Sequence, residues 1–306
     1  MARPYRVYFV YTRRKRDTGS TVMRAFQLRE MLAQHASARI EAGLIEMPER
    51  ADGFAAQERW VLSLPRDAVY VISKTAVRKL SSRAAHLLRW WGRGLCFDHV
   101  DEPQDRMRFA GADLHLSCSF TQQDALSARP ELAGRVRLVH HHVDPEIYRL
   151  PQAQQAQFAA LYLGDPLNTE VPPEIAAEVT QLPASTRAEF EAALPRLPEY
   201  NLHFCARRFR AGQEGAFKPF LKGFTAAALG AVVLASRDTE DAERFLGADY
   251  PFFFDCGEAP AVLERARDAF GGPVWTEARA RMAAMAEAVR PEAIANQLAN
   301  VVEEFY

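Results

Sequence analysis

The sequence has few of the features that mark several protein classes. Its 306 residues include four scattered cysteines and no CxxC pair, so neither a zinc site nor a disulfide framework is predicted. It has no run of about eighteen apolar residues and no charged-then-apolar leader, which predicts a soluble, cytoplasmic protein. The formal net charge of −1 argues against a general nucleic-acid-binding or membrane-coating protein. No repeat of about twenty to fifty residues indicates a solenoid.

Apolar residues make up 48% of the chain, and they form short strands that alternate with helices. Helices are predicted at about 21–35 and 77–91, from about residue 120 with Ser119 or Thr121 as the cap, and at 293–305 with the apolar residues on one face. Such alternation predicts an α/β protein with parallel sheets covered on both faces, here as two doubly wound domains, 1–150 and 151–290. The predicted strands are 6–11, 38–45, 68–72, 94–97, 113–117, 136–140, 159–163, 200–205, 231–236 and 251–254.

Ligands of open α/β sheets bind beyond the carboxyl ends of strands, so residues directly after strands carry the functional interpretation. After the first strand comes TRRKRDTGSTVMR. Gly19 allows close approach of a ligand, Ser20 or Thr21 can cap the following helix, and Arg24 is included in the same acceptor- or phosphate-facing loop. The run 13–16 is either a solvated basic loop or an anion-facing one.

A polar cluster follows the fourth predicted strand in the segment CFDHVDEP. Asp98, His99 and Asp101, with Glu102 beside them, could supply a general base or bind a hydroxylic substrate. They could also hold a metal, or form a polar loop in which Asp101 caps a turn. The three histidines 140–142 cannot all face one point on an extended chain, so a linker is a better interpretation than a metal site.

A second cluster, of cations, follows the strand 200–205. Lys218 and Lys222 fall on one side of a helix if that helix begins by Pro219. Cations and helix N–H groups together neutralise a pyrophosphate, which favours a phosphate site over a plain basic surface. The cations that leave the strand end or enter the helix are Arg207, Arg208, Arg210, Lys218 and Lys222.

Several segments stand in an order that resembles one family. They are GSTVMRAFQLREML, ADLHLSCSFTQQDAL, LVHHHVDPEIY, YLGDPLN, LKGFTAAALGAVVLAS and the closing WTEARARM…QLANVVEEF. Together they resemble the GT-B glycosyltransferases, closest to the group 1 or GT4-like branch. Val143, Asp144 and Tyr148 match its domain-junction motif, where His141 and His142 replace Asn-Gly.

The resemblance implies two Rossmann-like domains facing across a cleft, with 291–306 as a helix that crosses back to the first domain. It implies transfer of a sugar from a nucleotide-diphosphate sugar to a glycan, lipid-linked or other hydroxyl acceptor, with no metal and no further cofactor. The donor would be held by Lys218, Lys222 and one of Arg207 or Arg208. The acceptor would lie near Gly19, Ser20, His99 and Asp101.

The catalytic base, if one is needed, would be Asp98, His99 or Asp101. The family often carries two glutamates about eight residues apart in the donor domain. Here Phe217 and Thr225 stand at those positions, so that pair does not recognise the ribose, and Thr225 is included among the donor-binding residues.

Other functions remain open. A degenerate, non-catalytic nucleotide-sugar-binding or partner subunit is favoured by the missing glutamates, and a nucleotide-sugar epimerase would share the phosphate cations. A dehydrogenase is disfavoured because no G-x-G-x-x-G follows a strand. The basic loop also predicts peripheral contact with an anionic membrane carrying a lipid-linked acceptor.

Overall fold

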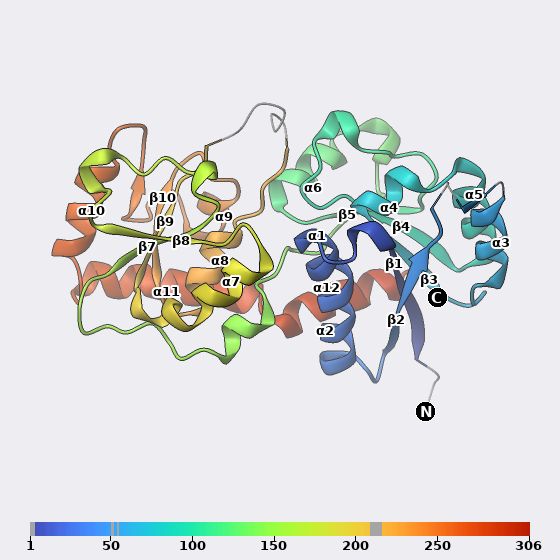
Figure 1. Cartoon of the computed structure of the whole chain (residues 1–306), viewed down its shortest axis with the longest axis horizontal. Coiled ribbons are helices and arrows are strands. Elements are labelled where there is room, and N and C mark those ends of the chain that lie inside the picture. Colours follow the sequence, from blue (N-terminus) through green and yellow to red (C-terminus); the bar gives the residue numbers. More distant parts are fainter. Residues whose placement is uncertain (1–3, 50–51, 54, 209–215) are drawn as a thin grey trace. The chain divides into compact units, whose positions relative to one another are not determined.

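The computed structural model describes residues 4–49, 52–53, 55–208 and 216–306 (Figure 1). Within these residues the chain forms two compact units. The first takes in the chain up to His141, residues 216–217 and Pro291–Tyr306, and the second takes in residues 142–208 and Lys218–Arg290. The boundary between the two units therefore lies between His141 and His142, ahead of the predicted boundary at residue 150.

The first unit is built on a six-stranded sheet in the order β2-β1-β3-β4-β5-β6, and every neighbouring pair is parallel. Buried β-branched and aromatic residues make these segments strands, because such side chains pack well on a pleated surface. The strands are β1 (Tyr5–Thr12), β2 (Ile40–Met47), β3 (Val69–Ser73), β4 (Gly94–Asp98), β5 (Leu114–Ser117) and β6 (Val136–Leu138).

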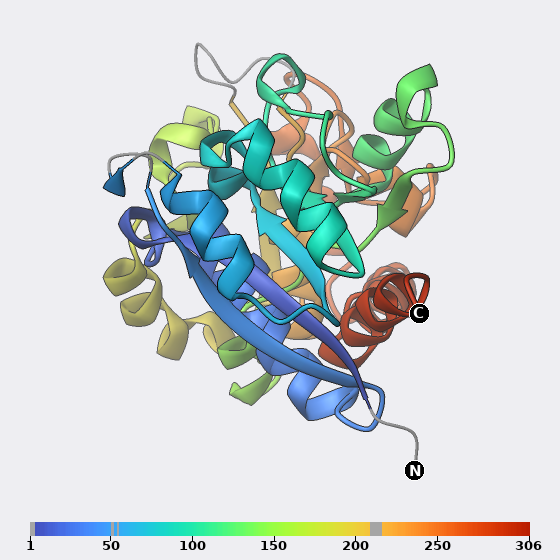
Figure 2. The ribbon, with the colours of Figure 1, turned by 90° about the vertical axis from the view of Figure 1, so that its right-hand side faces the viewer.

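Helices cover both faces of this sheet (Figure 2). Val7 and Phe9 of β1 pack on one face with α2 and α12, whereas Val10 packs on the other with α4 and α5, as strand alternation requires. The helices are α1 (Gly19–Thr21), the π-helix Val22–Gln27, α2 (Leu28–His35), α3 (Ala56–Ser63), α4 (Lys74–Lys79), α5 (Ser82–Trp91), α6 (Phe120–Ser127) and α12 (Pro291–Glu303).

Two predicted helices differ from the observed ones. The predicted helix 77–91 is two helices, α4 and α5, broken after Leu80 because the Ser81 side chain caps α5 by accepting the Ala84 N–H. The helical segment expected from about residue 21 already begins at Gly19, so neither Ser20 nor Thr21 is its cap. The predicted cap of α6 is confirmed for Ser119, whose hydroxyl accepts the Gln122 N–H at 3.1 Å.

The C-terminal helix α12 belongs to the core of the first unit. Ile294, Leu298 and Val302 are fully buried and pack in one cluster with Leu28 and Leu32 of α2. The hydrophobic repeat of about 3.6 residues along α12 places these side chains on one face, which explains the packing. The prediction that 291–306 returns to the N-terminal part of the chain is confirmed.

The second unit has a five-stranded parallel sheet in the order β11-β10-β9-β7-β8. Its core gathers around Trp275 and Phe252. The strands are β7 (Ala160–Gly164), β8 (Val179–Pro183), β9 (Leu202–Cys205), β10 (Val232–Ser236) and β11 (Phe253–Phe254). The helices are α7 (Arg187–Ala193), α8 (Leu221–Ala228), α9 (Ala242–Leu246), α10 (Ala259–Asp268) and α11 (Pro273–Ala288).

Short 3-10 helices complete the connections. They are Arg13–Lys15, Gln104–Arg106, Pro130–Leu132, Pro145–Arg149, Pro166–Asn168, Pro173–Ile175 and Leu194–Glu199. Among the described residues, no helix is both long and apolar enough to cross a membrane.

Candidate functional site

Each sheet has one point where its strand order reverses, and ligands of open α/β sheets bind at such points beyond the strand ends. In the first unit the chain places β2 on one side of β1 and β3 on the other, so the reversal lies between β1 and β3. In the second unit it lies between β7 and β9. The carboxyl ends of these two strand pairs are therefore the candidate ligand sites, one in each unit.

Two buried hydroxyl groups mark the reversal point of the first unit. Thr12 ends β1 and Ser73 ends β3, the strand paired beside it, and their side chains are 1% and 6% exposed. Neither hydroxyl oxygen has a hydrogen-bond partner within the described part of the chain. A buried hydroxyl without a partner is unfavourable, so both groups are suited to bind a hydroxyl of a ligand or water.

An ion pair stands next to these hydroxyls. Lys74 follows Ser73 directly as the first residue of α4, and its Nζ lies 2.6 Å from Oδ1 of Asp101. Both side chains keep part of their surface in solvent, 21% for Lys74 and 30% for Asp101. Asp101 is thus the predicted catalytic residue that is accessible at this edge of the sheet.

Asp98 and Arg24 form a second pair that is completely buried. Arg24 lies in the π-helix, and its Nε is 2.8 Å from Oδ2 of Asp98, with both side chains 0% exposed. Its Nη1 also donates to the carbonyl oxygens of Val139 and His140, at 3.0 and 2.9 Å. The nitrogens of Arg24 thus bond to groups inside the protein. The pair therefore positions the π-helix against β4 and the chain after β6.

His99 is buried against another histidine. The Nε2 atom of His99 lies 3.0 Å from Nδ1 of His115, and the two rings stack with their centroids 5.2 Å apart. Burial lowers the pKa of His99 to about 3, assisted by His115, and burial lowers that of His115 to about 4. Both imidazoles are therefore neutral near pH 7, and His99 is a weak base that no solvent reaches.

The loop after β4 is held in an unusual conformation. Val100 has φ of +49°, a region that β-branched residues rarely adopt. The Val100 N–H donates to Oδ1 of Asp98 at 3.3 Å, and its carbonyl accepts from Nε2 of Gln122 at 2.6 Å. These contacts fix the direction in which Asp101 and Glu102 leave the sheet, and strain of this kind gathers at functional sites.

Glu102 adds a carboxyl group that the predicted catalytic set leaves out. Its side chain is 1% exposed, and Nε of Arg78 lies 3.1 Å from its Oε1. Burial raises the pKa of Glu102 to about 7, although Arg78 and Lys74 oppose this shift. A carboxyl that titrates near neutral pH suits proton transfer. Its place in the polar cluster after β4 is the feature of the sequence that indicates a functional role for Glu102.

The loop between β1 and the first helix is open. Arg13, Arg14, Lys15 and Arg16 are exposed, and a Cβ added at Gly19 would have no atom within 4 Å. Ser20 is half-buried, whereas Thr21 is buried and its Oγ1 accepts from Oγ1 of Thr18 at 3.1 Å. Packing therefore does not require the glycine, which leaves room for a ligand at the helix start.

In the second unit, Lys222 occupies the reversal point. Its side chain is partly buried, and its Nζ lies 5.2 Å above the ring of Tyr162 in β7. A Cβ added at Gly164, the last residue of β7, would stand 3.4 Å from that Nζ. Lys222 makes no salt bridge to any described residue. Burial lowers the pKa of its ammonium group and the nearby Arg207 lowers it further, whereas Cys205 and Asp165 oppose the shift.

Lys218 does not share a helix face with Lys222, so this part of the prediction is wrong. Helix α8 begins at Leu221, and Phe220 before it has a non-helical ψ of 46°. The residue before a proline is pushed out of the helical region, which keeps Lys218 outside the helix that follows Pro219. The Lys218 N–H instead donates to Oε2 of Glu240, in the loop after β10.

The remaining predicted donor residues take different positions. Arg207 is partly buried two residues after the end of β9, and Arg208 is exposed, with its backbone N–H donating to the Asn168 carbonyl at 2.9 Å. Thr225 is buried, and its hydroxyl donates to the Leu221 carbonyl one turn earlier at 3.0 Å. Arg210 lies outside the described residues.

Metal-ligating side chains do not gather in the described part of the chain: no three His, Cys, Asp or Glu residues there are placed to hold an ion. Cys96, Cys118 and Cys205 are buried and Cys256 is exposed, all as free thiols.

No protein-family model and no curated protein matches this sequence. Solved structures do match over nearly its whole length. A glycosyltransferase from Rickettsia africae is similar with a TM-score of 0.65, 8% identity and 99% of each chain covered. HepE from Anabaena, solved with UDP and glucose, is similar with a TM-score of 0.63 and 11% identity over 98% of this chain and all of that one.

Sucrose-phosphate synthase from Thermosynechococcus elongatus is similar with a TM-score of 0.59 and 14% identity, over 98% of each chain. Two parallel α/β units and a C-terminal helix that returns to the first unit accompany this likeness. The chain therefore has the GT-B fold, with two Rossmann-like domains.

Proposed function

We propose that this chain is a glycosyltransferase of the GT4-like branch that moves a sugar from a nucleotide-diphosphate sugar to a hydroxyl acceptor. The observation that carries the proposal is Lys222, a partly buried ammonium group without a salt bridge to any described residue, at the reversal point between β7 and β9. Burying a cation is unfavourable unless an anion pairs with it. A bound diphosphate supplies that anion.

Two cations meet at this point and can share the diphosphate charge. Arg207 leaves β9 close enough to Lys222 to lower its pKa, so the two positive charges repel each other. A phosphate between them removes the repulsion and gains charge-assisted hydrogen bonds. As the bond from sugar to phosphate breaks, the leaving diphosphate gains negative charge, which these cations stabilise most strongly at that moment. We propose that this charge stabilisation needs no metal ion.

Similarity in fold to nucleotide-sugar-binding proteins supports the donor class. Structures of HepE contain UDP, and one contains UDP-glucose. We propose that the second unit of this chain binds a donor of the same class. Thr225 contributes to the packing of α8 through its bond to Leu221, so ribose recognition would depend on other groups.

The acceptor would bind at the reversal point of the first unit. Thr12 and Ser73 offer unpartnered hydroxyls, and Asp101 offers a partly exposed carboxylate beside them. An acceptor hydroxyl held there would lose its proton to Asp101, the accessible carboxylate of this cluster. The acceptor class we propose is a glycan or a lipid-linked glycan.

A thermal-shift series with UDP, GDP, ADP, CMP and dTDP, each with and without magnesium, tests the donor site. A ligand that binds the folded state raises the melting midpoint once its concentration exceeds the dissociation constant. Lys222→Met keeps the length of the side chain and removes its charge, so it should abolish the shift. Arg265→Met, on the exposed surface of α10, is the matched control and should not change it.

An unchanged diphosphate shift in Lys222→Met would contradict the assignment of the phosphate site. Lys222→Met should also leave the melting midpoint without ligand equal or higher, because it removes a buried charge with no ion-pair partner. A large loss of stability would instead indicate that Lys222 has a structural role.

A second candidate is a nucleotide-sugar-binding protein without turnover. Thr225 favours it, because a threonine bonded within its own helix stands where the family usually has a ribose-binding glutamate. A clear diphosphate shift with neither hydrolysis of the nucleotide sugar nor transfer to any acceptor would support this candidate over the enzyme.

A further inference from the structure

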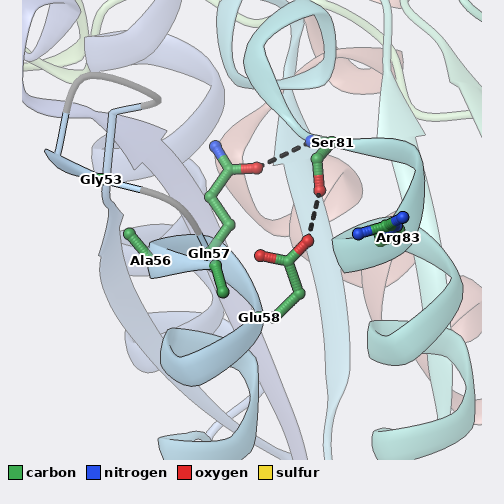
Figure 3. Close-up of a pocket in the computed structure, with 7 residues that line it drawn as sticks. Gly53, Ala56, Gln57, Glu58, Ser81 and Arg83 are labelled. Atoms are coloured by element: carbon green, nitrogen blue, oxygen red, sulfur yellow. Dashed lines mark hydrogen bonds between the residues drawn. The ribbon is translucent and has the colours of Figure 1, made fainter.

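A hollow of about 260 Å³ lies between the first turns of α3 and α5 in the first unit (Figure 3). The proposed transfer site does not use it. Gly53, Ala55 and Ala56 form its apolar wall, and Glu58, Ser81 and Arg83 supply polar groups. Small-molecule sites usually occupy about 300–1,000 Å³ and combine an apolar wall with a few placed polar groups, so this hollow suits one ring-sized unit.

One side chain of the hollow, Gln57, has both its amide nitrogen and its amide oxygen hydrogen-bonded within the protein. Gln57 is 3% exposed, and its Nε2 donates to the carbonyls of Pro48 and Lys79, both at 3.1 Å. Its Oε1 accepts the Ser81 N–H at 2.7 Å. Gln57 therefore ties the start of α3 to the start of α5 and to the chain after β2. The two helix starts are therefore joined before any ligand arrives, which lowers the entropy lost on binding between them.

Two opposite charges line the hollow without pairing with each other. Glu58 points across from α3 and its Oε1 accepts from the Ser81 hydroxyl at 3.3 Å, as Figure 3 shows. Neither Glu58 nor Arg83 forms an ion pair with any residue in the ranges the structure describes. One carboxylate and one guanidinium together accept and donate hydrogen bonds at no net charge.

This set of groups selects the chemistry of the ligand. A phosphate would face Glu58 and an amine would face Arg83, so a strongly charged ligand meets repulsion from one of them. The hydroxyl groups of a sugar both donate and accept, and its C–H face can pack on Ala55 and Ala56. A neutral saccharide unit matches both the polar groups and the apolar wall.

The position of the hollow relates it to the proposed acceptor site. Helix α4 begins at Lys74, the partner of Asp101, and ends at Lys79, whose carbonyl accepts from Gln57. Six residues of α-helix span about 9 Å. Asp101 and the hollow therefore lie near opposite ends of α4, within the same unit.

We propose that this hollow is a saccharide subsite for a second unit of the acceptor, so that the acceptor is an oligosaccharide chain rather than a single sugar or a small alcohol. This inference rests on the proposed function. Glu58 and Arg83 are then specificity residues that hold a remote sugar, and they take no part in the transfer step.

Saturation-transfer NMR tests the subsite with named probes: maltose, cellobiose, lactose, chitobiose and glucose. We expect at least one disaccharide to bind. Glu58→Gln and Arg83→Ala should each weaken it about tenfold, the usual effect of losing one charged hydrogen-bond partner. Arg59→Ala, also exposed on α3 but outside the hollow, should bind like the native chain.

Two results would overturn the inference: no probe sugar binds the native chain, or binding is unchanged in both Glu58→Gln and Arg83→Ala. The diphosphate thermal shift is measured on the same variants and reports on the other unit. A normal UDP-type shift without sugar binding refutes the subsite and leaves the proposed function standing. Sugar binding that depends on Glu58 and Arg83 supports the subsite even where no nucleotide binds, which would refute only the transfer reaction.

Discussion

Asp98→Ala is the substitution whose effect on stability the structure predicts most directly. The change removes the carboxylate that faces Arg24, and both side chains are fully buried with Nε 2.8 Å from Oδ2. Arg24 keeps its bonds to the carbonyls of Val139 and His140 but loses the one carboxylate that pairs with it among the described residues. The guanidinium then remains charged inside the protein, because its pKa is too high for it to lose a proton.

Breaking a buried ion pair by removing one partner destabilises a protein by about 3–5 kcal/mol. The two remaining carbonyl bonds of Arg24 place the expected value near the lower limit, at about 3 kcal/mol. The double variant Arg24→Met with Asp98→Leu should lose much less, because it removes both charges and fills the space with apolar atoms. Asp98→Ala alone should therefore be less stable than the double variant.

Urea unfolding followed by tryptophan fluorescence measures these values, since three of the four tryptophans, Trp60, Trp90 and Trp91, lie in the first unit. Asp67→Ala is the matched control. Asp67 pairs with Arg93 at the exposed surface, where such a pair contributes about 0–1 kcal/mol. If Asp98→Ala is no more destabilising than Asp67→Ala, the buried pair does not stabilise the fold and the reasoning is refuted.

Three further predictions concern pH and charge. Burial lowers the pKa of His99 and His115 in the folded state, so the unfolded chain binds more protons below pH 6.5. The free energy of unfolding should therefore fall by up to about 1.4 kcal/mol per pH unit for each histidine as the pH drops toward 4. Urea midpoints measured across this pH range should fall less steeply in His115→Asn, and as steeply as in the native chain in His86→Gln, which changes an exposed histidine. The raised pKa of Glu102 has the opposite sign, so stability should decrease as pH rises from about 4.5 to 7, and Glu102→Gln should remove that decrease; an identical profile would argue that the carboxyl is not buried. Replacing the exposed cations 13–16 with Gln should reduce co-sedimentation with phosphatidylserine vesicles in low salt, and binding that salt does not weaken would contradict an electrostatic contact.

The fold class follows from local patterns along the chain. Alternating apolar strands and amphipathic helices specify parallel sheets with helices on both faces, because strand and helix periods are local properties of the chain. Local signals also placed Ser119 as a helix cap and Asp98 at the end of β4. The apolar stripe of the last helix predicted that it packs on a core.

Which residues come into contact depends on how the strands and helices pack together. Arg24 and Asp98 are 74 positions apart, and nothing local in the sequence pairs them. Thr12 and Ser73 lie at neighbouring strand ends only because β3 pairs with β1 rather than with β2. Lys218 and Lys222 are four residues apart in the sequence, yet Pro219 delays the helix, so only Lys222 lies on α8, beside Tyr162 and Gly164 at the end of β7. Strand order and burial depend on the free energy of the whole core, so a pattern read over a few residues cannot fix them.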